Sequence, residues 1–110
     1  MVTMPSCSNG AKAKYAEQKA YVDSLQKANK QEITGAMLMD SEMRIYSVKM
    51  KCYGAEVKAL DSLTVLAREA FGDNSAEYKE AYDKKIKAEE ANEEVSAEST
   101  KALRRAAFGI

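Results

Sequence analysis

The feature that most constrains this fold is an apolar repeat of about 3.5 residues that begins at Tyr15 and ends at Phe71. Stepping alternately by three and four residues visits seventeen positions, and thirteen of them are apolar. With 45% apolar residues in the chain, chance would place about eight there. Such a repeat is typical of helices packed side by side along their length. The positions are Tyr15, Gln18, Val22, Leu25, Asn29, Glu32, Ala36, Met39, Met43, Tyr46, Met50, Tyr53, Val57, Leu60, Thr64, Ala67 and Phe71.

The composition also favours helix. The 110 residues include one Pro and five Gly, and they are rich in Ala, Lys and Glu, which lose little side-chain freedom in a helix. Strand-forming residues nowhere alternate with period two between turn signals. We therefore predict an all-α fold, either a helical hairpin or a small helical bundle, with a long central helix.

Turn and cap residues suggest where the helices end. Residues 1–10 are rich in such residues, so we expect an irregular N-terminal segment followed by a single helical domain over 11–110. The polar positions between Asn29 and Gly35 leave two alternatives open. The chain either breaks or bends there, or it continues as one helix through 11–71.

The clearest punctuation is Gly72-Asp73-Asn74-Ser75. Gly72 stands where a glycine can close a helix, and Asn74 or Ser75 can cap the next one. We predict a helical hairpin at this point, with helices over about 11–30, 36–71 and 75–107.

A second apolar set lies off the repeat, between Ile33 and Leu66. A helix that is apolar on more than one side is buried on more than one side. The segment from Ala36 to Phe71 should therefore be the central element. Its members are Ile33, Leu38, Ile45, Val48, Cys52, Leu63 and Leu66.

The repeat has two interpretations, a core within one chain or a seam shared between chains. The last predicted helix has too short an apolar stripe to cover the whole repeat, which favours a shared seam. We expect burial of the face from Met43 to Leu60, and of the C-terminal tail, against neighbouring copies. The predicted interaction residues are Met43, Tyr46, Met50, Tyr53, Val57, Leu60, Phe108 and Ile110.

Catalytic chemistry has little support. The chain has no His, its cysteines Cys7 and Cys52 form no close motif, and no nucleotide-binding or hydrolase motif is present. We expect no enzyme activity, no cofactor and no metal. The acidic stretch Glu89, Glu90, Glu93, Glu94 and Glu98 has three interpretations: a solvated face, a docking surface for a basic partner or a divalent cation site.

Charge and hydropathy indicate the class of partner. A formal net charge of +0 argues against nucleic acid, and we expect no membrane insertion. The N-terminus has no Sec signal pattern, so we expect a cytoplasmic protein or one packaged or exported by a specialised route. The leading hypothesis is a non-enzymatic structural subunit of a virion, filament or secretion component, bound to copies of itself or to other subunits. The alternative is a small helical chaperone, inhibitor or adaptor that holds one protein partner.

Overall fold

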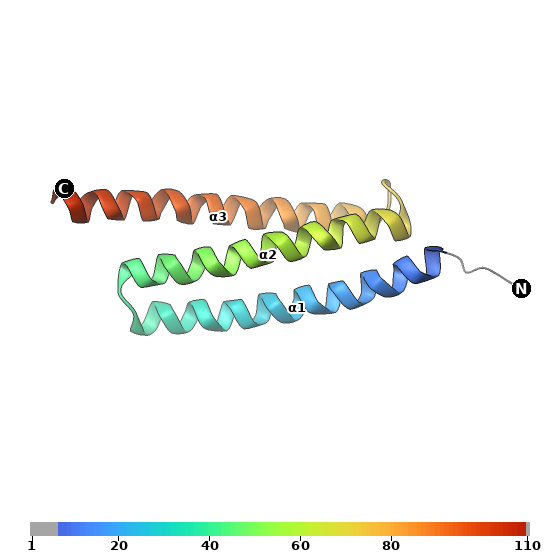
Figure 1. The fold of residues 1–110 in the computed structure, drawn as a ribbon, viewed down its shortest axis with the longest axis horizontal. Helices are drawn as coiled ribbons and strands as arrows, with labels where there is room; N and C mark the ends of the chain where they lie inside the picture. Colours follow the sequence, from blue (N-terminus) through green and yellow to red (C-terminus); the bar gives the residue numbers. More distant parts are fainter. Residues whose placement is uncertain (1–6, 110) are drawn as a thin grey trace, which may run out of the picture.

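The computed structural model describes residues 7–109 and contains three α-helices (Figure 1). They are α1 (Cys7–Met39), α2 (Glu42–Phe71) and α3 (Ala76–Phe108). No strand occurs among these residues, and the prediction of an all-α bundle is confirmed. The helices lie side by side in an elongated body of 71 × 24 × 17 Å.

Helix α2 is the central element and packs against both α1 and α3. Each outer helix buries one residue in every seven, which keeps a single stripe against α2. In α1 the stripe is Tyr15, Val22, Asn29 and Ala36. In α3 it is Ala81, Ala88, Val95 and Ala102. The off-repeat residues Ile45, Val48 and Cys52 pack against the end of α1, as the prediction of two buried sides requires.

The connection between α1 and α2 lies at Asp40 and Ser41. The predicted break or bend between Asn29 and Gly35 is therefore wrong, and so is the alternative of one helix through 11–71. The α1 helix continues because its polar seam residue Asn29 finds hydrogen-bond partners on α2. Ser41 begins α2 as an N-cap whose hydroxyl oxygen accepts from the Arg44 N–H at 3.4 Å.

The start of α1 also differs from the prediction. Residues 7–10 belong to the helix, whereas an irregular segment was expected over 1–10. Residues 1–6 of that segment lie outside the described residues.

The second connection confirms the hairpin predicted at Gly72. Gly72 adopts φ 94°, a conformation that favours glycine, and its N–H donates to the Arg68 carbonyl at 2.9 Å. Ser75, rather than Asn74, caps α3 by accepting from the Tyr78 N–H at 3.1 Å.

The three helices meet near this second connection and diverge towards the first. Leu60 of α2 lies in one core cluster with residues of α1 and α3, including Val22 and Ala88. The Lys19 ammonium of α1 lies 3.8 Å from the Glu80 carboxylate of α3. Towards the Asp40 connection, α1 and α3 move apart on either side of α2 (Figure 1).

We expect Leu60→Ala to destabilise the bundle by about 2–5 kcal/mol, because a buried leucine leaves a cavity when truncated. Leu60 is 0% exposed, whereas Leu103 is 55% exposed. The matched variant Leu103→Ala should therefore change the stability by only about 0.5 kcal/mol. Urea unfolding followed by circular dichroism measures both. Equal losses in the two variants would contradict the packing described here.

Candidate protein interaction surface

The divergence of the outer helices leaves an open groove between α1 and α3, with α2 as its floor. Two adjoining hollows share Gln26, Tyr53 and Glu56, and a third lies further along α1 and α2 towards the Asp40 connection. The walls come from Gln26, Lys30, Ile33, Thr34 and Met37 of α1 and from Lys84, Lys87, Ala88 and Ala91 of α3. The floor is Glu42, Ile45, Tyr46, Lys49, Tyr53 and Glu56 of α2.

The floor follows from helical spacing. Tyr46, Lys49, Tyr53 and Glu56 are separated by three or four residues and so lie on one face of α2. Nearer the Gly72 connection, the same side of α2 carries Leu60, which the outer helices cover completely. The groove is thus the uncovered continuation of the core.

Glu56 is the buried charge of this floor, with 9% of its surface exposed. Its Oε2 accepts a hydrogen bond from Asn29 Nδ2 at 2.9 Å, and the same amide donates to the Cys52 carbonyl at 3.0 Å. A buried carboxylate needs such donors because it has lost hydration. The pair therefore ties α1 to α2 at the point where the groove opens.

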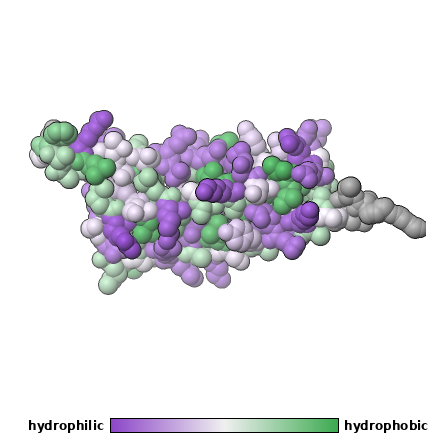
Figure 2. Space-filling model, in the orientation of Figure 1, coloured by the Kyte–Doolittle hydropathy of each residue, from purple (hydrophilic) through white to green (hydrophobic). Residues whose placement is uncertain are grey.

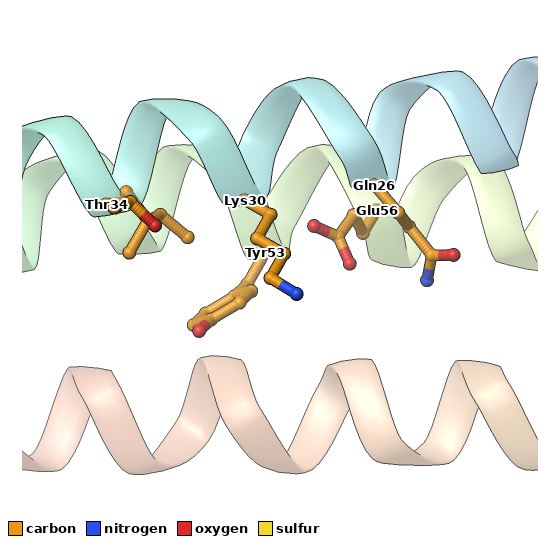
Figure 3. A pocket seen from close by; sticks show the side chains of 6 residues that line it. Gln26, Lys30, Thr34, Tyr53 and Glu56 are labelled. Carbon is orange, nitrogen blue, oxygen red and sulfur yellow. The ribbon is translucent and has the colours of Figure 1, made fainter.

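The close view shows how these side chains lie (Figure 3). Tyr53 and Lys30 reach from α2 and α1 towards α3, and Glu56 and Gln26 lie beside them (Figure 3). Burial raises the pKa of Tyr53, and the negative charge of Glu56 adds to that rise. Tyr53 stays a neutral phenol at physiological pH, with a ring for apolar contact and a hydroxyl for hydrogen bonding.

At its wide end the groove meets a cluster of exposed apolar side chains, which we call the apolar end. An ion pair of 3.3 Å between Arg105 Nη2 and Glu42 Oε2 brings the end of α3 to the start of α2. Apolar residues gather over the last turns of α3 (Figure 2). The apolar end consists of Met37, Leu38 and Met39 of α1, Met43 of α2 and Leu103 and Phe108 of α3.

Exposure at the apolar end is high. Leu38 is 78% exposed, Met39 is 85% exposed and Phe108 is 73% exposed. Contiguous apolar surface on a folded chain often marks a place that another protein covers, and these exposed side chains at one end of the bundle are candidates for such a place.

The structure places the predicted interaction residues in different surroundings. Met43 and Phe108 belong to the apolar end, while Tyr46 and Tyr53 form the groove floor. Met50 is partly exposed and Val57 is half-buried against the core. Leu60 is buried within the chain and cannot meet a partner in this fold. Ile110 lies outside the described residues.

The apolar repeat does not predict the contribution of α1 to this surface. Met37 and Leu38 fall within a helix that the sequence predicts from Ala36, whereas the structure places them at the end of α1, beside the connection. The available signal was Ser41, a good N-cap followed by Glu42 in the first helical turn.

Charged residues without partners occupy the second half of α3. Among the described residues, no ion pair involves the acidic stretch Glu89, Glu90, Glu93, Glu94 and Glu98. The same holds for Lys101 and Arg104, whereas Arg105 pairs with Glu42. Both signs of charge are thus available on one helix.

Features that would indicate other chemistry are few. Cys52 is a free buried thiol, and burial raises its pKa, which disfavours the nucleophilic thiolate. Among the side chains described, those of residues 10–109, no three acidic or cysteine groups gather where they could hold a metal ion. No helix among the described residues is apolar over a length that would cross a bilayer.

No protein-family model, curated protein or solved structure matches this chain.

Asn29→Ala should destabilise the bundle by about 1–3 kcal/mol, because it leaves the Glu56 carboxylate buried without its donor. Gln18→Ala is a matched control, since Gln18 Nε2 donates one hydrogen bond of 2.9 Å to the neutral Ala59 carbonyl. That control should lose about 1 kcal/mol. A double-mutant cycle with Glu56→Ala measures the coupling of Asn29 to Glu56. Additive effects in that cycle would contradict the pairing.

Proposed function

We propose that this chain is a non-enzymatic helical subunit of a multi-chain assembly and that it acts by packing against helices of neighbouring subunits. The observation that carries the proposal is the groove floored by Tyr46 and Tyr53 and its continuity with the apolar end. Covering these residues would remove apolar surface from water at roughly 25 cal/mol per Å². The kind of assembly, such as a virion, filament or secretion component, belongs to the same proposal.

The shape of the bundle supports this mode of action. Two of the three helices end at the apolar end, and α2 begins there, so all three present side chains to one neighbour. A helix laid in the groove would contact α2 between two walls, as a fourth member of the bundle. The Tyr rings supply large contact areas with little loss of side-chain freedom.

A small helical chaperone, inhibitor or adaptor is the second candidate. The observation that favours it is the row of lysines on the groove walls, Lys30, Lys84 and Lys87. These ammonium groups would attract an acidic helix of a different protein. A folded chain that stays monomeric at every concentration would favour this candidate over the assembly subunit.

Tyr53→Glu should abolish assembly and leave the helices intact, because it places a charge at the groove floor where a partner would exclude water. The measurement is molar mass by light scattering after size exclusion over a concentration series, with circular dichroism on the same samples. Tyr21→Glu is the control, since Tyr21 is exposed on α1 and is not among the groove-lining residues. Assembly of Tyr53→Glu at wild-type strength would refute the proposal.

A further inference from the structure

One face of α3 carries a pattern that is complementary to itself. Its residues are separated alternately by three and four positions, so they lie along one side of the helix. In order they are Ala91, Glu94, Glu98, Lys101, Arg105 and Phe108. We call this set the α3 face. In reverse order the spacing of these residues is the same. The acidic pair Glu94 and Glu98 then takes the place of the basic pair Lys101 and Arg105.

The α3 face borders the groove. Ala91 lines its wall, and Arg105 reaches Glu42 on the floor. The carboxylate of Glu94 adds to the rise in the pKa of Tyr53, whose largest cause is burial. The face therefore lies beside the wide part of the groove, where the tyrosine floor is uncovered.

Within one chain the charges of this face are poorly compensated. Glu94 and Glu98 stand four residues apart and repel each other, and so do Lys101 and Arg105. In the part of the chain that the structure describes, only Arg105 of these four makes an ion pair. That pair is exposed on both sides, with 52% and 57% of the two side chains accessible, so Arg105 can exchange partners at little cost.

We propose that two copies of this chain pair through the α3 face, with their α3 helices antiparallel and related by a two-fold axis. This inference rests on the proposed function and names the partner as a second copy. The register places Glu98 opposite Lys101 of the second copy and Glu94 opposite its Arg105. Ala91 then lies opposite its Phe108, and each contact occurs twice because the interface is isologous.

The order of charges along the α3 face, two acidic residues followed by two basic residues, favours a second copy in the antiparallel orientation. A parallel copy in register would set glutamates against glutamates and basic residues against basic residues, and the like charges would repel. In the antiparallel arrangement every charged residue of the face meets the opposite sign. The spacing of the face is the same in both directions along the helix. In an antiparallel pair each residue of the face therefore stays opposite its partner along the whole contact.

The pairing also accounts for the exposed C-terminal turns of α3. All residues from Leu103 to Gly109 are exposed, and Arg105 lies level with Glu42 at the start of α2. The residues after Arg105 therefore project past the α1–α2 connection (Figure 1). In the pair, the C-terminal turns of α3 lie along the groove wall of the second copy. Phe108 is then carried towards the Ala91 wall, beside Tyr53.

Charge reversal tests the register. The acidic pair is reversed in Glu94→Arg with Glu98→Lys, and the basic pair is reversed in Lys101→Glu with Arg105→Glu. Each double variant then carries one sign along the whole face, and its self-association should weaken by at least about a hundredfold. A one-to-one mixture of the two variants restores every opposite-charge contact and should form a heterodimer as strong as the wild-type pair. Sedimentation equilibrium at low salt measures both quantities, because added salt would screen the charges.

Matched controls change the same charges outside the α3 face. Glu93→Lys and Arg104→Glu alter exposed residues of the same helix, and they should leave self-association unchanged. Circular dichroism of every variant checks that the bundle is folded.

Two outcomes would overturn the pairing. If the wild type assembles and either double variant assembles equally well, or their mixture does not associate, the antiparallel register is wrong and the proposed function stands. If the wild type is monomeric at every concentration, the pairing and the proposed assembly fall together.

Discussion

The rest of this structure depends on the burial of α2 between α1 and α3. These two outer helices diverge along the length of α2. Leu60 marks the place where α1 and α3 both cover it, and there the core is closed. Beyond Glu56 the outer helices diverge, and α2 keeps its apolar and aromatic side chains without enough cover. A chain of this size exposes a large fraction of its surface. The most exposed large apolar side chains here, Met39, Leu38 and Phe108, belong to the apolar end.

Polar contacts hold the divergence in place. The Asn29 amide and the Glu56 carboxylate meet at 2.9 Å where the groove begins, and the Asn29 amide also donates to the Cys52 carbonyl at 3.0 Å. Buried polar pairs of this kind set the register of packed helices because a slip would leave them unsatisfied. The same contacts keep Tyr46 and Tyr53 at the groove floor, where association with another helix would complete the packing that α1 and α3 leave unfinished.

Much of this arrangement could be predicted from the sequence. The seven-residue spacing from Tyr15 to Phe71 and the Gly72–Ser75 turn fix helical packing and the second hairpin, because both are local signals. The first hairpin is marked locally only by the Ser41 cap and Glu42, and the polar seam residue Asn29, whose partners lie on α2, points instead to a break earlier in the chain. The groove itself depends on the angle between α1 and α3, which no local pattern encodes. For that reason the sequence prediction of interaction residues grouped Tyr53, at the groove floor, with Leu60, which the fold buries.

The central claim is that the wide end of the groove and the apolar end form the surface through which this chain meets another subunit. Amide hydrogen exchange, measured at low and high protein concentration, tests it most directly because it locates protection along the chain. The account predicts slower exchange at high concentration in three segments: the end of α1, the start of α2 and the second half of α3. Exchange that is independent of concentration, or protection gained only around the Gly72 connection, would contradict it.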